Sequence, residues 1–403
     1  MKHTQHQINS AQLKFSMNWG IGLIFLTTAC VVNAGELVAA KTSALTAKEK
    51  LGQQLFFDTN LSTPVGQACA SCHNPKTFFI DPDKNQPTSD GALPHLKGNR
   101  NTPMVLYNAF SPPFHYDSKE GLYIGGQFLD GRAATLAEQA KGPFLNPLEM
   151  ANPDKNTVVN KVRKASYAKL FIQVYGTNAF NNANSAYNKI ADALAAFERT
   201  PIFRPFTSKY DYFLAGKAKF TDQEKRGRQL FEDENKGNCA ACHPSRPAED
   251  GTPPLFTDFS YDNLGVPQNP NNPFYQLPSR LNPEGRKFVD KGLGGVVHET
   301  AENGKFKVPT LRNIAKTEPY MHNGYFKTLE GITDFYSNRD IKPVCKKAWV
   351  TEADALKQGC WPKPEVTQNV NINELGELNL NTEEIKALVA FLKTLTDGYK
   401  TNN

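Results

Sequence analysis

Apolar residues recur at helical spacing in two similar segments of the chain, residues 45–58 and 220–233. The residues on the apolar face are Leu51, Leu55 and Phe56 in the first segment, and Leu230 and Phe231 in the second. Both segments open with a threonine followed three residues later by a glutamate, at Thr46–Glu49 and Thr221–Glu224. This spacing is typical of a capping box at a helix N-terminus. The sequence therefore predicts one short amphipathic helix near the start of each half of the chain.

A second pair of amphipathic segments closes the two halves. Their apolar residues are Ile190, Leu194 and Phe197 in the first half, and Ile385, Leu388, Phe391, Leu392 and Leu395 in the second. Stretches rich in Pro, Gly and Asn, such as residues 82–103 and 250–280, lie between the helical patterns. The repetition predicts a mainly α fold with long irregular loops, built from two related domains at residues 44–204 and 209–397.

Residues 1–34 have the pattern of a secretory signal peptide. Lys2 and Lys14 precede a mostly apolar stretch, residues 19–32, and Ala34 ends a small-residue cleavage site. The apolar stretch is short for a transmembrane helix. The segment therefore predicts export to the periplasm, with lipoprotein anchoring through Cys30 as the alternative.

Composition changes this picture little. The chain has 403 residues, of which 39% are hydrophobic, an ordinary value for a globular protein. Its formal net charge is +6, and the signal segment contributes two lysines and no acid to it. The remaining basic residues are scattered, so the sequence does not predict nucleic-acid binding.

Two Cys-x-x-Cys-His motifs carry the most specific chemical signal. They are Cys69-Ala-Ser-Cys72-His73 and Cys239-Ala-Ala-Cys242-His243. In such a motif the two thiols form thioether bonds to haem vinyl groups, and the histidine binds the iron. The alternatives are a redox-active pair and half of a zinc site, but zinc needs two more soft ligands nearby and neither motif has them. The motifs therefore predict two covalently bound c-type haems, one in each of two cytochrome c-like domains packed together.

Cys345 and Cys360 remain once the haem motifs and the signal segment are set aside. They lie close in sequence, and the periplasm permits disulfides, so we expect them to pair rather than to remain free thiols. Both belong to residues 338–376, which also hold Trp349 and Trp361 and have the character of an insertion in the second domain.

Beyond the haem motifs, the chain resembles the bacterial di-haem cytochrome c peroxidase family, which includes the MauG-type enzymes. The segments that carry the resemblance are Arg100-Asn101-Thr102-Pro103, Phe128-Leu129-Asp130-Gly131-Arg132, Gln139-Ala140-Lys141-Gly142-Pro143, Glu149-Met150, Val308-Pro309-Thr310-Leu311-Arg312-Asn313 and Pro319-Tyr320-Met321-His322-Asn323-Gly324. They occur in the family's order and cover nearly all of the chain after the signal segment. The resemblance implies two haem domains with a calcium ion near their interface. It also implies an N-terminal haem that reacts with peroxide and a C-terminal haem that passes electrons.

The resemblance assigns the peroxide chemistry to two polar residues. Glu149 matches the acid–base residue that moves a proton between the two peroxide oxygens, and Gln139 matches the amide that orients the bound oxygen species. Without the resemblance, Glu149 would be interpreted as a solvated surface acid. The Gly142-Pro143 pair before it is expected to form a turn.

The further iron ligands leave alternatives open. His95 lies in the loop where many family peroxidases carry a capping histidine, and the alternative is a surface histidine beside an open iron. Tyr336 stands where the peroxidases carry a ligating methionine and MauG-type enzymes a tyrosine. A phenolate lowers the reduction potential of the iron relative to a thioether. Alternatively, Met321 is the ligand, and Tyr336 is a packed aromatic in a helix with Ile332 and Phe335.

Two further features follow from the resemblance. Leu129 stands where family members commonly place a tryptophan between the haems, so exchange of charge between the haems is expected to be slower or to use another route. Asn101 matches a side-chain ligand of the calcium ion, and Lys307 and Pro309 would offer backbone carbonyls. His322 is expected to pack beside the second haem rather than to bind its iron.

Together these features predict a periplasmic enzyme that reduces hydrogen peroxide to water with electrons from a small cytochrome c or a cupredoxin. The first alternative is a MauG-like enzyme that oxidatively modifies a partner protein, which Tyr336 favours and Leu129 disfavours. The second is a non-catalytic electron-transfer cytochrome, which Glu149 and Gln139 disfavour. Family members are often dimers, so a homodimer is a further expectation, for which the sequence shows no interface.

Overall fold

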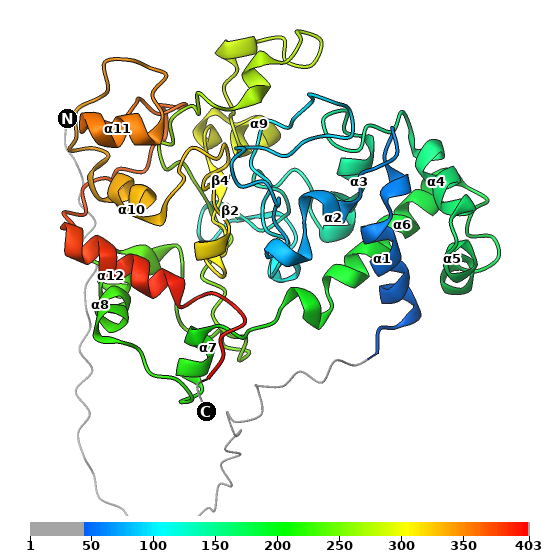
Figure 1. Ribbon diagram of the computed structural model, residues 1–403, viewed down its shortest axis with the longest axis horizontal. Helices are drawn as coiled ribbons and strands as arrows, with labels where there is room; N and C mark the ends of the chain where they lie inside the picture. The colour runs from blue at the N-terminus through cyan, green and yellow to red at the C-terminus, as the bar shows by residue number, and fades with distance from the viewer. Residues whose placement is uncertain (1–43, 402–403) are drawn as a thin grey trace, which may run out of the picture. The chain divides into compact units, whose positions relative to one another are not determined.

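The structure is a computed structural model that describes residues 44–401, and the predicted signal segment lies outside the described residues. Within residues 44–401 the fold is mainly helical, as predicted (Figure 1). The α-helices are α1 (Ala47–Phe57), α2 (Cys69–Cys72), α3 (Leu136–Leu145), α4 (Lys155–Lys164), α5 (Ala168–Tyr175), α6 (Ala183–Glu198), α7 (Lys209–Leu214), α8 (Asp222–Glu232), α9 (Leu293–Val297), α10 (Leu329–Asn338), α11 (Glu352–Gln358) and α12 (Thr382–Lys393). Short 3-10 helices are η1 (Thr59–Leu61), η2 (Pro75–Thr77), η3 (Asn108–Phe110), η4 (Pro201–Phe203), η5 (Cys239–Ala241), η6 (Pro273–Gln276), η7 (Gly285–Lys287), η8 (Thr300–Glu302) and η9 (Ile314–Lys316).

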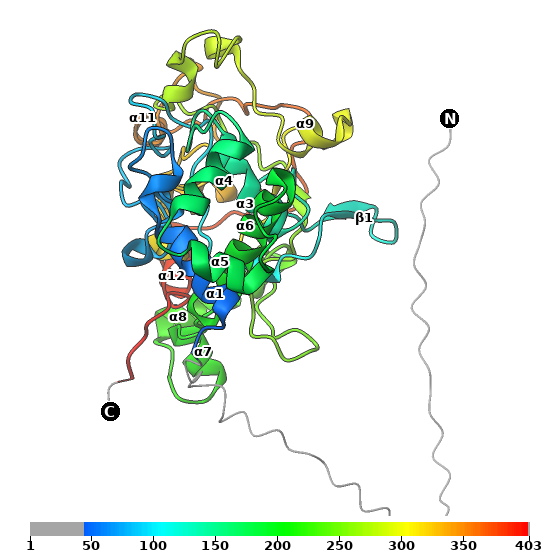
Figure 2. The ribbon, with the colours of Figure 1, turned by 90° about the vertical axis from the view of Figure 1, so that its right-hand side faces the viewer.

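The strands form two small antiparallel pairs. β1 (His115–Asp117) pairs with β2 (Leu122–Ile124), and β3 (Tyr261–Asp262) pairs with β4 (Phe306–Lys307). Figure 2 shows β1 and its hairpin projecting away from the helices. Residues 82–103 and 250–280 are mostly irregular, apart from isolated bridges and, in the second stretch, β3 and η6, which confirms the predicted irregular stretches. No helix in the described part of the chain is long and apolar enough to cross a membrane.

The two predicted opening helices are α1 and α8. Both begin with the predicted capping box, in which the side chains of Thr46 and Thr221 accept hydrogen bonds from the backbone N–H groups of Glu49 and Glu224. The predicted apolar faces are buried: Leu51, Leu55 and Phe56 on α1, and Leu230 and Phe231 on α8. The caps satisfy N–H groups that a helix leaves unpaired at its start, so the sequence sets where both helices begin.

The opening and closing helices cross in the same way in both halves. α1 packs against α6, and α8 packs against α12. A Cβ atom on Gly52 would lie 1.9 Å from the carbonyl oxygen of Ala193, and one on Gly227 would lie 1.9 Å from that of Ala387. Only a glycine permits so close an approach of two backbones, so the crossing point is built identically twice.

The buried side chains of the described residues fall into separate clusters. The largest draws its fully buried members from residues 51–203, and the other two draw theirs from residues 210–395. Aromatic edge-to-face contacts join the helices in each, for example between Phe56 and Phe197 and between Phe231 and Phe391. The exact domain limits that we place near residues 204 and 209 remain a prediction.

Polar contacts tie the first half of the chain to the second. The Tyr107 hydroxyl donates a hydrogen bond to Asp397 at 2.8 Å. The Arg100 guanidinium donates two hydrogen bonds of 2.7 Å to Asp290 and one of 2.6 Å to Asp130. Bidentate charge-assisted bonds of this kind are directional, so they hold the two halves in one arrangement.

Residues 338–376 are integrated into the second half. Cys345 and Cys360 form the predicted disulfide. Trp361 is 2% exposed, and its indole N–H donates a hydrogen bond to Asn338. The segment that has the character of an insertion therefore contributes to a core.

The expected turn at Gly142-Pro143 is wrong. α3 continues through both residues and ends at Leu145, and the chain turns at residues 147–150 instead. A proline near a helix end removes a single backbone hydrogen bond. Phe144, which is 1% exposed and packs on Tyr187, stabilises the last turn of the helix in compensation.

Candidate active site and haem cavities

Each Cys-x-x-Cys-His motif lies on the wall of a cavity. We call the cavity beside residues 69–73 the N-terminal cavity and the one beside residues 239–243 the C-terminal cavity. Their volumes are about 190 and about 300 Å³. A single water needs only about 10–15 Å³. Both cavities can therefore receive a group much larger than water.

The two motif histidines are oriented as metal ligands. Nδ1 of His73 lies 3.3 Å from the carbonyl oxygen of Phe79, and Nδ1 of His243 lies 2.7 Å from that of Phe256. Because a carbonyl only accepts, Nδ1 carries the hydrogen and Nε2 keeps the lone pair that binds a metal. Burial lowers the pKa of His73 to about 4 and also lowers that of His243, so both rings are neutral.

The motif thiols are partly buried and protonated. Cys69, Cys72, Cys239 and Cys242 are free of disulfides, and burial raises the pKa of each to about 12. A redox-active Cys-x-x-Cys pair needs a lowered pKa instead, because the thiolate is the reactive form. In the N-terminal cavity, two buried oxygens, Gln67 Oε1 and Glu198 Oε2, have no hydrogen-bond partner among the described residues. Protonated thiols and oriented imidazoles in both cavities, together with the unpaired oxygens of the N-terminal one, fit a haem in each cavity.

Glu149 and Gln139 both line the N-terminal cavity, with His73. Gln139 projects from α3, and Glu149 lies in the turn after that helix. The side-chain N–H of Asn146 donates a hydrogen bond of 2.7 Å to Glu149 Oε1. Burial raises the pKa of Glu149, while Asn146 and the charge of Arg132 oppose that rise. The two residues that were assigned to peroxide chemistry therefore meet in one cavity, and their roles remain predictions.

His95 lies apart from this group. It is exposed, has a left-handed backbone conformation, and is not among the residues that line either cavity. The sequence left capping and surface exposure open for His95, and in this conformation the side chain is on the surface. Whether it binds iron in another state of the loop stays a prediction.

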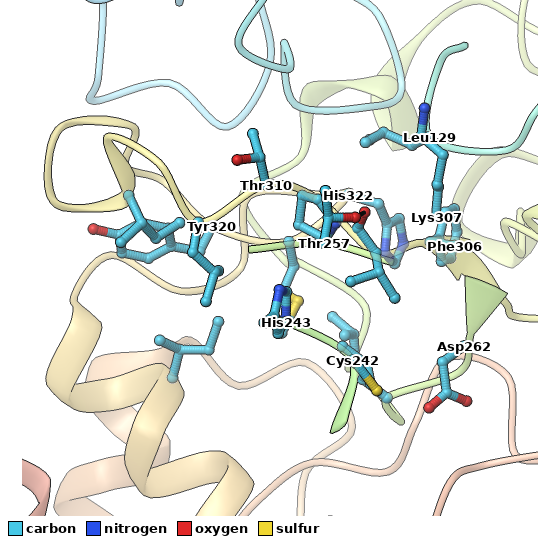
Figure 3. A pocket seen from close by; sticks show the side chains of 18 of the residues that line it. Leu129, Cys242, His243, Thr257, Asp262, Phe306, Lys307, Thr310, Tyr320 and His322 are labelled. Carbon is cyan, nitrogen blue, oxygen red and sulfur yellow. Dashed lines mark hydrogen bonds between the residues drawn. The ribbon is translucent and has the colours of Figure 1, made fainter. Parts of the chain in front are cut away.

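One stretch of wall separates the two cavities. Residues 101–103 and residues 127–129 line both of them. Leu129, at the predicted relay position, is part of this shared wall, and its carbonyl oxygen accepts a hydrogen bond from Lys307 N–H at 2.8 Å. Figure 3 shows His243 and Cys242 on one side of the C-terminal cavity, and Leu129 with Lys307 along another. The shared wall thus contains the aliphatic side chain of Leu129 at the predicted relay position and, next to it, the aromatic side chain of Phe128.

Tyr336 and Met321 both line the C-terminal cavity. Tyr336 comes from α10, the predicted helix, which also carries Ile332 and Phe335. Burial raises the pKa of Tyr336, so its phenol is neutral until a metal cation displaces the proton. The geometry brings both candidate ligands to the same cavity and leaves the choice between them open.

His322 packs as expected beside this cavity. Its ring stacks on Phe306 with the centroids 3.8 Å apart, and its Nε2 lies 3.3 Å from Glu365 Oε2. The three predicted calcium ligands, Asn101, Lys307 and Pro309, line the same cavity. The ammonium of Lys307 donates a hydrogen bond to the carbonyl oxygen of Gly126, and burial lowers the pKa of this lysine to about 8.

One functional candidate escaped the sequence analysis. Glu198 is the last residue of α6, is 6% exposed and lines the N-terminal cavity. A comparison of the two closing helices could have found it. Glu198 follows Phe197 in the first helix, whereas the residue after the matching Phe391 in the second helix is Leu392.

Two repeated helical halves, each with a cavity beside a Cys-x-x-Cys-His turn, define a di-haem protein with cytochrome c-like domains. The family described as di-haem cytochrome c peroxidase matches residues 46–219. The methylamine utilization protein MauG of Paracoccus denitrificans is 38% identical over 386 residues, which cover 92% of this chain and 96% of MauG. The chain belongs to the di-haem cytochrome c peroxidase family, whose members are oxidoreductases that act on peroxide.

Two further similarities come from peroxidases. The cytochrome c peroxidase Ccp of Escherichia coli is 34% identical over 286 residues, covering 70% of this chain and 51% of that protein. The crystal structure of the di-haem peroxidase BthA from Burkholderia thailandensis superposes with a TM-score of 0.74 at 31% identity, covering 89% of this chain and 87% of BthA. The family relatives thus include both peroxidases and MauG proteins.

Proposed function

We propose that this protein is an exported di-haem peroxidase that reduces hydrogen peroxide to water with electrons from a small cytochrome c or a cupredoxin. The observation that carries the proposal is the meeting of Glu149, Gln139 and His73 in one cavity. A carboxyl with a raised pKa accepts and returns a proton more readily near neutral pH than an ordinary glutamate does.

The chain would hold one c-type haem in each cavity. His73 and His243 would bind the irons, and the paired thiols of each motif would form the thioether bonds. Bound haem supplies the electrons and the coordination position at which peroxide is reduced. In the C-terminal cavity, Tyr336 or Met321 would be a second protein ligand of the iron, which suits a site that exchanges electrons and binds no substrate.

Glu149 performs the proton transfer that peroxide cleavage needs. Hydrogen peroxide loses a proton from one oxygen and receives a proton on the other before its O–O bond breaks. Asn146 holds Oε1 of Glu149, which leaves Oε2 for the proton, and the Gln139 amide positions the oxygens. Two electrons and two protons then convert one hydrogen peroxide into two waters, and each donor molecule gives up one electron.

The test is peroxide-dependent oxidation of a reduced small cytochrome c by the purified haem-loaded protein. We expect turnover that consumes two donor molecules per hydrogen peroxide. Absence of turnover above that of a haem-loaded protein inactivated at Glu149 would contradict the proposal.

The relatives and Tyr336 favour a second candidate function, oxidation of a partner protein. Similarity to MauG extends over nearly the whole chain, and an anionic tyrosine ligand stabilises oxidised iron. This function predicts that peroxide-treated enzyme oxidises residues of a partner while cytochrome c oxidation is negligible. We place this function second because Leu129 is aliphatic at the predicted relay position, although the neighbouring Phe128 also lines both cavities.

Two accessory features belong to the proposal. Asn101, with the backbone carbonyls of Lys307 and Pro309, would bind calcium, and we expect chelation to lower peroxidase activity and added calcium to restore it. Export predicts a mature chain that begins at Gly35 and is recovered in the periplasmic fraction. Activity that is unchanged after chelation, or an intact N-terminus in the cytoplasm, would contradict these two points separately.

A further inference from the structure

Glu198 is a buried carboxyl in the N-terminal cavity to which the proposed peroxide chemistry gives no role. It ends α6 and is 6% exposed. In the part of the chain that the structure describes, nothing donates a hydrogen bond to its buried Oε2 atom. A buried carboxylate without a partner is costly, so this atom calls for an explanation other than packing.

The repeated architecture supplies a matched position in the other half. Gly52 of α1 meets the Cβ atom of Phe197 on α6, and Gly227 of α8 meets that of Phe391 on α12, in both cases as the crossing point of two helices. The residue after each phenylalanine lines the adjacent cavity, and it is Glu198 in one half and Leu392 in the other. At this matched position, only the cavity that carries Glu149 has a carboxyl, whereas the carboxyl groups that line the other cavity, Asp262, Asp290, Glu365 and Glu374, lie elsewhere in its wall.

The surroundings of Glu198 hold it close to the neutral form. Burial raises its pKa to about 7, and the nearby charge of Arg199 opposes that rise. The lining residues from α1 and α3 carry no titratable group among those described. Besides the haem attachment motif, the titratable or charged residues that line this cavity are Asp90, Arg100, Arg132 and Glu149. Glu198 lines the same cavity as Cys69, and its charge contributes to the raised pKa of that thiol.

We propose that Glu198 is a redox-linked proton site: its carboxylate takes up one proton when the haem held in the N-terminal cavity accepts one electron, and it releases that proton when the haem is oxidised again. The electron comes from a one-electron donor protein, so one electron and one proton enter the cavity together and its charge stays constant. The inference rests on the proposed haem attachment at residues 69–73 and goes beyond the proposed peroxide reaction.

The physical cause is the low dielectric of the cavity. A positive charge lost from a nearby metal raises the pKa of a buried carboxyl, because the charges interact strongly where water is excluded. In the C-terminal cavity the matched residue, Leu392, cannot bind a proton, so no proton uptake is expected at that position. The first proton needed for peroxide reduction is thus already in the cavity once the electron has arrived.

Potentiometric titration of the haem-loaded protein between about pH 5.5 and about pH 8.5 tests the proposal. This range extends on both sides of the Glu198 pKa of about 7, so the protonation state of the carboxyl changes within it. We expect the midpoint potential of one of the two one-electron waves to decrease as the pH rises. Its limiting slope should be about 59 mV per tenfold change in proton activity. Glu198→Gln should abolish that slope and leave the other wave unchanged. Glu138→Gln, which alters an exposed glutamate of the same half, should leave both waves as in the wild type.

Two results would overturn the proposal: a slope that survives in Glu198→Gln, or two wild-type waves that are both independent of pH. If Glu198→Gln does not incorporate haem, infrared difference spectroscopy of the wild type decides. Reduction should produce the carbonyl band of a protonated carboxylic acid, shifted in Glu198→Asp, and absence of the band contradicts the assignment. Neither measurement uses peroxide, so a protein without peroxidase activity still gives a result.

Discussion

The two halves of the molecule share a frame and differ in what lines their cavities. In both, a capped opening helix crosses a closing helix at a glycine, and a neutral imidazole is held by a backbone carbonyl. The N-terminal cavity adds Gln139, Glu149 and Glu198 to this frame. The C-terminal cavity has Tyr336 and Met321 as candidate iron ligands, and Leu392 in place of Glu198.

This difference teaches where the function resides. The residues proposed to hold the cofactor belong to the repeated frame, whereas the residues proposed to handle protons lie on α3, on the turn after it and at a single position of α6. A cofactor can thus be attached twice by one design, and a few substitutions then give the two copies different chemistry.

The largest effect is expected where the cavities differ most. Glu149→Gln keeps the shape of the side chain and the hydrogen bond from Asn146 but removes the proton acceptor. We expect kcat/KM for peroxide to fall by about 10²- to 10⁴-fold, the usual contribution of general acid–base catalysis, with haem content unchanged. Glu138→Gln on α3 is the matched control and should retain full activity. Equal activity of the two variants would show that Glu149 has no catalytic role.

The second prediction concerns a buried ion pair that belongs to the second half. The guanidinium of Arg312, which is fully buried, donates two hydrogen bonds to Asp211 at 2.9 and 3.0 Å. Arg312→Met leaves a buried carboxylate unpaired and should cost about 3–5 kcal/mol of unfolding free energy. Urea unfolding followed by the fluorescence of Trp349 and Trp361 measures it in that half.

The double variant of Arg312→Met with Asp211→Asn provides the control for this pair. Because no charge is then left unpaired, it should be more stable than the single variant. A double variant at least as unstable as Arg312→Met would mean that packing, not the charge, is responsible.

The third prediction tests the ion pair between Arg100 of the first half and Asp290 of the second. Burial opposes ionisation of Asp290, but the charge and hydrogen bonds of Arg100 outweigh it and lower the pKa of Asp290 to about 2. A depressed pKa stabilises the folded state above the unfolded value of about 3.9, and this contribution is lost as the pH falls from about 4 to about 2. The loss should amount to about 2–3 kcal/mol.

Urea unfolding of the wild type and of Asp290→Asn, compared at about pH 5 and about pH 2.5, measures this contribution. The variant should be less stable than the wild type at the higher pH, and the difference should shrink at the lower pH. A difference that is the same at both values would show that Asp290 is not the titrating group.

The smallest effects sharpen the claim that the frame is repeated. Gly52→Ala and Gly227→Ala each place a methyl group against a backbone carbonyl, so each should destabilise its half by about 1–3 kcal/mol, and by similar amounts. Gly98→Ala is the control, since its new methyl group would meet only one atom, at 4.0 Å. A large difference between the first two variants would mean that the crossings are not equivalent.

Local patterns predicted the repeated frame from sequence. The capping boxes at Thr46 and Thr221 and the apolar faces of α1 and α8 depend on neighbours within one or two helical turns, and the structure confirms them. The pairing of Cys345 with Cys360 was predictable for a similar reason, because no other cysteine outside the haem motifs and the predicted signal segment was left for either.

Features that depend on distant residues were beyond such reasoning. Arg312 and Asp211 are 101 residues apart, and no pattern in the sequence links them. Glu198 follows Ile190 and Leu194 at helical spacing and so falls on the apolar face of α6, but the spacing does not show that this face borders a cavity. The Gly142-Pro143 pair was misjudged because turn propensity was weighed without the packing of Phe144.

The most direct test of the contrast between the halves is the stoichiometry of carbon monoxide binding to the fully reduced, haem-loaded protein. Carbon monoxide binds a reduced haem iron only where an axial position is open. The account predicts one carbon monoxide per protein, bound in the N-terminal cavity, because Tyr336 or Met321 would occupy the second ligand position of the other iron. Two bound molecules, or none, would contradict the division of the molecule into one reactive and one electron-transfer cavity.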